Sequence, residues 1–150
     1  LLGDLKYGRT VHSLAYALSM YKTELTFVSP KSLKMPKEVV EECQKLGVEP
    51  KCTGNLNKAI KDADVLYVTR IQKERFPDPE EYNKIVGAYR INKETLDKCK
   101  KDMIVMHPLP RVTEIDPEID KTSNALYFKQ AFNGVPVRMA LLSLVTGVKK

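Results

Sequence analysis

The chain has 150 residues, a formal net charge of +6 and three cysteines. This length suits a single domain with its own core. No apolar run approaches the roughly 20 residues that span a membrane, and the residues present include no secretory signal, so no membrane partner is expected. The cysteines lack CxxC spacing, which favours reduced thiols in the cytoplasm and predicts no metal site.

The positive charge admits anionic partners, nucleic acid among them. Lysines alternate with acids along the predicted helices, however, and pairs such as Glu41/Lys45 and Glu94/Lys98 have the i,i+4 spacing of an ordinary solvated face. The sequence contains no RNP, zinc-finger or other nucleic-acid-binding motif. We therefore predict a solvated surface and no nucleic-acid partner.

The predicted elements alternate between strands and helices from the first residue. A strand over 1–5, which we interpret as the end of a strand in a longer protein, leads to a helix with the apolar stripe Val11, Leu14, Ala15 and Leu18. After a strand over 25–29, a helix begins at Pro36 and ends at Gly47, with the stripe Val39, Val40, Cys43 and Leu46. A weak strand over 48–52 precedes a helix that Asn55 caps and that carries Leu56, Ala59, Ile60 and Ala63.

The second half continues this alternation. A strand over 65–68 is followed by a short helix through Tyr82 and Val86, and Asn92 caps another helix that reaches Cys99. A strand over 103–106 precedes an irregular acidic stretch at 116–120 and a final helix carrying Val137, Ala140, Leu141, Leu144 and Val145. This order predicts an α/β fold, a doubly wound (Rossmann-like) parallel sheet of about five strands with helices on both faces, in a single domain. No GxGxxG motif follows a strand, so no dinucleotide site is predicted.

Cationic and amide side chains directly follow the strand over 65–68. Arg70 and Gln72 are separated by one residue, so both point the same way if the backbone is extended. In an open α/β sheet, ligands bind outside the carboxyl ends of the strands, and Lys6 and Arg9 follow the first strand in the same way. A guanidinium beside a carboxamide can bind a carboxylate.

Each arginine also has a purely structural interpretation. Arg9 stands near a helix N-terminus, where the dipole disfavours a cation, and would pair with Asp4 or another surface acid. Arg70 would pair with Glu74 or Glu81. Two arginines at the same edge of a sheet nevertheless favour a ligand with two acidic groups.

The strand over 103–106 ends in a turn with two prolines. Pro108 and Pro110 lack backbone donors, which leaves rigid carbonyl acceptors suited to a ligand amine or amide; the alternative is a plain strand-ending turn. Together with the arginines, such carbonyls describe a site for an acidic amino acid. His107 is interpreted either as an acid or base or as a histidine bonded to the backbone, and His12 as a half-exposed structural residue.

Three segments resemble signatures of the aspartate-binding domain of aspartate carbamoyltransferases. They are Gly3-Asp4-Leu5-Lys6-Tyr7-Gly8-Arg9-Thr10-Val11-His12-Ser13-Leu14, Thr69-Arg70-Ile71-Gln72-Lys73-Glu74-Arg75 and His107-Pro108-Leu109-Pro110-Arg111, in the family's order. The resemblance extends through Tyr127-Phe128 and the segment 138–142. The His-Cys-Leu-Pro and Ser-Met-Gly motifs expected of the paralogous ornithine enzymes are absent from the sequence.

The resemblance implies a role for the candidate residues. Arg9 would hold the α-carboxylate of L-aspartate, while Arg70 and Gln72 would hold its side-chain carboxylate. The carbonyls of Pro108 and Leu109 would face the attacking amine or the carbamoyl group, with the bond to Pro110 in cis.

Loop closure and the reaction are implied in the same way. Lys6 and Tyr7 would pair with acids such as Glu81 when a loop closes. The implied reaction joins carbamoyl phosphate to L-aspartate, giving N-carbamoyl-L-aspartate and phosphate in pyrimidine biosynthesis, with no cofactor and no metal.

By the same resemblance, residues 1–150 form the aspartate-binding domain, and the N-terminal carbamoyl-phosphate-binding domain is absent from this chain. We therefore expect the chain to be inactive alone and the full-length enzyme to be a cytoplasmic homotrimer. The alternative is a non-catalytic amino-acid-binding or regulatory domain on the same scaffold.

Overall fold

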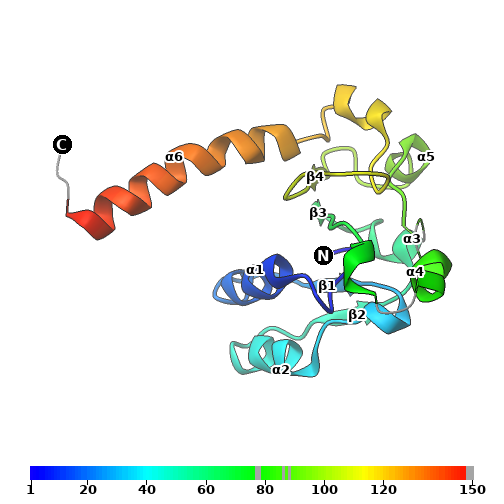
Figure 1. The fold of residues 1–150 in the computed structure, drawn as a ribbon, viewed down its shortest axis with the longest axis horizontal. Coiled ribbons are helices and arrows are strands. Elements are labelled where there is room, and N and C mark those ends of the chain that lie inside the picture. Colours follow the sequence, from blue (N-terminus) through cyan, green and yellow to red (C-terminus); the bar gives the residue numbers. More distant parts are fainter. Residues whose placement is uncertain (77–78, 86, 88, 148–150) are drawn as a thin grey trace.

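The computed structural model describes residues 1–76, 79–85, 87 and 89–147 (Figure 1). The first half contains α1 (Arg9–Ser19), β1 (Thr26–Val28), the short 3₁₀ helix η1 (Lys31–Leu33), α2 (Lys37–Lys45), β2 (Lys51–Thr53) and α3 (Leu56–Ala59). The second half contains β3 (Val65–Tyr67), η2 (Lys73–Arg75), α4 (Pro79–Ile85), α5 (Lys93–Leu96), β4 (Ile104–Met106), η3 (Pro117–Lys121) and α6 (Tyr127–Thr146). Strands and helices therefore alternate as predicted, although the segment predicted as irregular at 116–120 contains η3.

The strands form two parallel pairs, β1 with β2 and β3 with β4. Leu2 lies between the pairs and makes parallel bridges to Val28 and to Val68. Its N–H donates to the carbonyl of Tyr67 at 2.8 Å, and its carbonyl accepts from the N–H of Thr69 at 2.8 Å. The structure thus contains two small parallel sheets with Leu2 between them, rather than the single sheet of about five strands that the sequence predicts.

The difference arises at Gly3. A full strand was predicted over 1–5, but Gly3 has φ +116°, which turns the chain out of the extended conformation one residue after Leu2. A second correction concerns β2, which was predicted over 48–52 and instead pairs over Lys51–Thr53.

Apolar side chains cover both faces of the strands. Phe27 belongs to a cluster with residues of α1 and α2, whereas its neighbour Val28 belongs to a second cluster on which α3 and α5 pack. Successive residues of a strand point to opposite faces, so the two clusters lie on opposite sides of the strands. The members of the α1–α2 cluster are Leu5, Val11, Ala15, Leu25, Phe27, Met35, Val39, Cys43 and Val48. The buried members of the other cluster are Leu2, Val28, Ile60, Leu66, Val68, Ile91, Met103, Val105, Ile115, Ile119 and Tyr127.

Local capping signals were predicted correctly. The side chain of Asn55 accepts from the N–H of Lys58 at the start of α3, and that of Asn92 accepts from the N–H of Thr95 at the start of α5. Burial was predicted less well: Leu46, assigned to the apolar stripe of α2, is 49% exposed.

Helix α6 extends away from the rest of the molecule (Figure 1). Its root is attached, since Tyr127 is fully buried, but Leu141, Leu144 and Val145 are 55%, 78% and 84% exposed. The predicted apolar residues of this helix therefore pack against nothing in the described part of the chain. Among the described residues, no helix is long and apolar enough to cross a membrane.

Candidate functional site

The segments that follow Leu2 and β3 run side by side. Thr69 donates to the carbonyl of Leu2 through both its N–H (2.8 Å) and its hydroxyl (3.0 Å). A Cβ at position 3 would lie only 2.3 Å from the carbonyl oxygen of Thr69, so glycine is required for this close approach. Because of this contact, the segment leading to Arg9 and the segment beginning at Arg70 leave the sheet next to each other.

An ion pair joins these two segments a second time. Arg75 donates to the carbonyl of Tyr7, and its guanidinium lies 3.7 Å from Oδ2 of Asp4. Asp4 is 1% exposed; its Oδ1 accepts from the N–H of Tyr7 at 2.9 Å, while Oδ2 has no hydrogen-bond partner among the described residues. Burial raises the pKa of Asp4, and the hydrogen bond from Tyr7 and the charge of Arg75 only partly oppose this.

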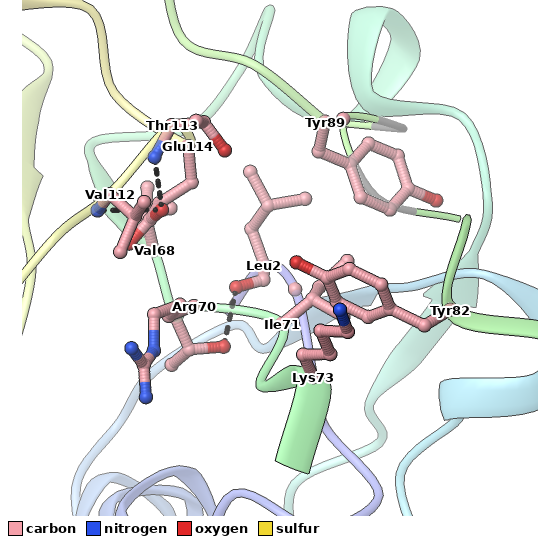
Figure 2. A pocket seen from close by; sticks show the side chains of 13 residues that line it. Leu2, Val68, Arg70, Ile71, Lys73, Tyr82, Tyr89, Val112, Thr113 and Glu114 are labelled. Carbon is pink, nitrogen blue, oxygen red and sulfur yellow. Dashed lines mark hydrogen bonds between the residues drawn. The ribbon is translucent and has the colours of Figure 1, made fainter. Parts of the chain in front are cut away.

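A cavity of about 220 Å³ opens beside Arg70. Figure 2 shows Arg70 and Glu114 on one side of Leu2, and Tyr82 and Tyr89 on the other. Its lining comes from the end of β3, from the region of α4 and from the segment after the proline turn: Leu2, Gly3, Val68, Thr69, Arg70, Ile71, Lys73, Tyr82, Gly87, Tyr89, Val112, Thr113 and Glu114. The cavity therefore lies outside the carboxyl end of β3, where a ligand of an α/β sheet is expected.

The proline turn is held by a buried polar network. His107 is 1% exposed; its Nε2 lies 2.8 Å from Oε1 of Glu114, and its Nδ1 accepts from the N–H of Leu109 at 2.8 Å. Oε2 of Glu114 accepts from the N–H groups of Val112 and Thr113. Burial alone would raise the pKa of Glu114, but the hydrogen bonds from His107 and the backbone outweigh it, and the pKa is lowered.

The turn itself has an unusual backbone. The Leu109–Pro110 peptide bond is cis, as the resemblance implies, and Leu109 has φ +53°. Pro108 and Pro110 are exposed and Leu109 is half-buried. Of the two interpretations of His107, bonding to the backbone is confirmed.

The other predicted residues are placed only in part. Arg9 is the exposed first residue of α1 and forms no ion pair among the described residues; the predicted pairing with Asp4 is wrong, because Asp4 faces Arg75. Among the described residues, the cavity lining includes Arg70 but neither Arg9 nor Gln72. Gln72 is half-buried and extended at φ −91° and ψ 114°.

Lys6 and Tyr7, which were predicted to take part in loop closure, lie beside a group of aromatic rings. The amine of Lys6 lies 4.8 Å from the ring centre of Tyr7, which meets Phe76 edge to face, and Phe76 packs on Tyr82 of α4. The side chain of Glu81, predicted to pair with Lys6 and Tyr7, lies outside the described part of the structure.

The whole chain was compared with known proteins. The family model described as "Aspartate/ornithine carbamoyltransferase, Asp/Orn binding domain" matches residues 1–145. The chain belongs to this carbamoyltransferase family. It is 62% identical over 148 residues to the aspartate carbamoyltransferase catalytic subunit of Thermococcus kodakarensis, covering 99% of this chain and 48% of that protein. It is 57% identical over 150 residues to the corresponding subunit of Methanothermobacter thermautotrophicus, covering 100% of this chain and 47% of that subunit.

Solved carbamoyltransferase structures show the same architecture. The catalytic subunit of M. jannaschii aspartate transcarbamoylase superposes with a TM-score of 0.89 at 51% identity, covering 99% of this chain and 49% of that chain. Aspartate transcarbamoylase from Trypanosoma cruzi, in complex with carbamoyl phosphate and aspartate, has a TM-score of 0.85 at 39% identity, covering 94% and 47%. The chain thus spans about half the length of the curated relatives it matches.

Two features of this carbamoyltransferase domain were missed by sequence reasoning. Glu114 completes the network around His107, and Arg75 connects the two arginine-bearing segments. The sequence did contain a signal for the contact of Arg75 with Asp4, because a carboxylate between Gly3 and Leu5 at the end of a buried strand needs a partner. No comparable signal marks Glu114, which lies seven residues from His107 in an irregular segment.

Proposed function

We propose that this chain is the aspartate-binding half of an aspartate carbamoyltransferase. The full-length protein would transfer the carbamoyl group of carbamoyl phosphate to L-aspartate, releasing phosphate and forming N-carbamoyl-L-aspartate for pyrimidine biosynthesis. The proposal is supported by relatives named as catalytic subunits over 99% of this chain. These relatives do not favour the alternative of a non-catalytic binding domain.

The observation that carries the proposal in this chain is the contact between Gly3 and Thr69. It places the segments bearing Arg9 and Arg70 next to each other at the carboxyl ends of parallel strands. A dicarboxylic amino acid needs two cationic groups at a fixed separation, and arginine forks bind carboxylates with two parallel hydrogen bonds. We assign the α-carboxylate to Arg9 and the side-chain carboxylate to Arg70 and Gln72.

The chemistry requires an amine brought close to a carbonyl carbon. The aspartate nitrogen forms the new C–N bond, the bond from that carbon to the phosphate oxygen breaks, and the amine loses a proton. Most of the rate enhancement available to this half of the site is positioning. In this proposal the carbonyls of Pro108 and Leu109, with Pro110 closing the turn, accept hydrogen bonds from the amine or the carbamoyl amide. Lys6 and Tyr7 would help to close the site through Glu81.

The remaining half of the protein would supply the carbamoyl-phosphate site. Helix α6 supports this division, because an exposed apolar helix is normally covered in the complete protein. We further propose that the strands form one continuous sheet of about five in the full-length chain, and that the enzyme is a cytoplasmic homotrimer.

Carbamoyl transfer by the full-length parent chain tests this proposal. The wild-type parent is expected to form N-carbamoyl-L-aspartate, whereas the 150-residue chain alone is expected to show no turnover. Activity should return when the chain is mixed with the missing half. An inactive parent, or substantial turnover by the 150-residue chain, would contradict the proposal.

Arginine variants of the parent test the assigned roles. Arg9→Gln and Arg70→Gln each remove charge-assisted hydrogen bonds of about 1.5–3 kcal/mol, so the KM for aspartate should rise roughly 10- to 150-fold. Arg90→Gln is the matched control, because Arg90 is an exposed arginine paired with Asp116. An unchanged aspartate KM in Arg9→Gln or Arg70→Gln would remove that residue from the site.

A further inference from the structure

The protonation state of the buried His107 ring follows from its contacts. The N–H of Leu109 can only donate, so the Nδ1 atom that it meets at 2.8 Å carries a lone pair. The hydrogen of the neutral ring is therefore on Nε2, which points at Oε1 of Glu114 at 2.8 Å. Glu114 is fixed in turn by the N–H groups of Val112 and Thr113.

This bond sets the direction of the Pro108 carbonyl. The Pro108–Leu109 peptide bond is not among the cis bonds of the described residues, and in a trans peptide the C=O and the N–H point in opposite directions. Since the N–H of Leu109 is directed at the buried His107 ring, the carbonyl of Pro108 is directed away from it. Leu109, whose N–H makes this bond, has φ +53°, a conformation that residues other than glycine rarely adopt.

We propose that His107 is a positioning residue for carbamoyl transfer: its Nδ1 holds the N–H of Leu109 and so orients the Pro108 carbonyl toward the reacting amine, while Glu114 fixes the tautomer of the ring. This rests on the proposed function. A catalytic acid or base role does not fit, because both ring nitrogens are engaged within the protein and the side chain is 1% exposed. The backbone N–H of His107 donates to the side-chain oxygen of Gln130 at 3.0 Å, so His107 has a third hydrogen bond besides those with Leu109 and Glu114.

Two amide substitutions in the full-length parent chain separate the functions of the two ring nitrogens. In His107→Asn, the shorter side chain places its oxygen near the position of Nδ1, which keeps an acceptor for Leu109 and loses the contact with Glu114. In His107→Gln, the longer side chain reaches the position of Nε2, which keeps a donor for Glu114 and loses the acceptor for Leu109. His12→Gln is the control, because Nε2 of His12 contacts the carbonyl of Leu5 and a glutamine amide can donate to the same oxygen.

We expect one His107 variant to lose mainly stability and the other to lose mainly activity. His107→Asn should keep kcat within about threefold while its Tm falls, because Glu114 loses a partner. His107→Gln should lose roughly 10- to 100-fold in kcat, as expected when a reacting group is misplaced by about 1 Å, with the smaller change in Tm. His12→Gln should match the wild type in both measurements.

Equal losses of kcat in the two His107 variants, or a kcat that simply follows Tm, would overturn the proposal. An inactive wild-type parent would instead refute the proposed function. In that case crystal structures of the two variants still decide the positioning claim: Leu109 should keep its positive φ in His107→Asn and lose it in His107→Gln. Retention of the turn in both variants would refute it.

Discussion

Two buried carboxylates near the candidate site have opposite environments. Glu114 accepts hydrogen bonds from His107, Val112 and Thr113, and its pKa is lowered. Asp4 has one backbone donor and an Oδ2 atom without a hydrogen bond among the described residues; burial raises its pKa. Both side chains are nearly inaccessible, at 9% and 1% exposure, so the number of donors and not the burial distinguishes them.

The comparison indicates that the two sides of the site are built differently. Around Glu114 both carboxylate oxygens accept hydrogen bonds, and such a network favours a single geometry. Around Asp4 the charge is only partly compensated, with Arg75 at 3.7 Å and bonded to the carbonyl of Tyr7 as well. The turn at 107–111 is therefore held by a more fully hydrogen-bonded carboxylate than the one that faces Arg75 between the two arginine-bearing segments.

The largest expected effect is that of Glu114→Gln in the full-length parent chain. A glutamine has one acceptor where the site presents donors on both sides, so its amide must face either the Nε2–H of His107 or the backbone N–H groups. Leaving a buried donor without an acceptor costs about 1–3 kcal/mol, and we expect a loss of roughly that size in thermal or urea unfolding. Glu41→Gln, on the exposed face of α2, should be within about 0.5 kcal/mol of the wild type. A stability of Glu114→Gln equal to that of this control would remove the contrast with Asp4.

Residues whose partners are close in sequence were predictable, and Glu114 was not. Asn55 and Asn92 were identified as caps because a cap bonds to an N–H only three residues away. The arginine segments were found because side chains at the ends of parallel strands share one edge. His107 and Glu114 lie seven residues apart in an irregular segment, and no periodicity relates two such positions. The strand predicted over 1–5 was too long for a similar reason, since the chain turns at Gly3, against Thr69.

The pH dependence of the unfolding free energy should further distinguish Glu114 from Asp4. The folded-state pKa of Glu114 lies below the usual glutamate value of 4.5, so its stabilisation is complete above pH 4.5 and is lost as the pH falls through the folded-state pKa. The deficit of Glu114→Gln should therefore shrink on acidification below that value. Unfolding free energies of wild type and variant, measured between neutral pH and the acid transition, check this. A deficit independent of pH would mean that the charge of Glu114 is unimportant.

Asp4→Asn should have the smallest effect on stability. Unlike Glu114→Gln, it should not destabilise the protein. The folded-state pKa of Asp4 lies above the usual aspartate value of 3.8, so the ionised form is disfavoured in the fold. Ionisation therefore lowers stability as the pH rises through the folded-state pKa. Asparagine keeps the acceptor for the N–H of Tyr7 and removes the buried charge. At neutral pH the variant should match the wild type within about 1 kcal/mol or exceed it, and the difference should vanish in acid.

Asp4→Asn should change the KM for aspartate even though it leaves the stability of the protein nearly unchanged. Arg75 loses its charged partner, so the two arginine-bearing segments are less firmly joined, and the KM for aspartate should rise severalfold without a matching change in Tm. Asp4→Glu is the companion variant, because it keeps the charge while its extra methylene must fit a fully packed position. If Asp4→Asn instead destabilised the protein as strongly as Glu114→Gln, both carboxylates would be structural anchors of the same kind.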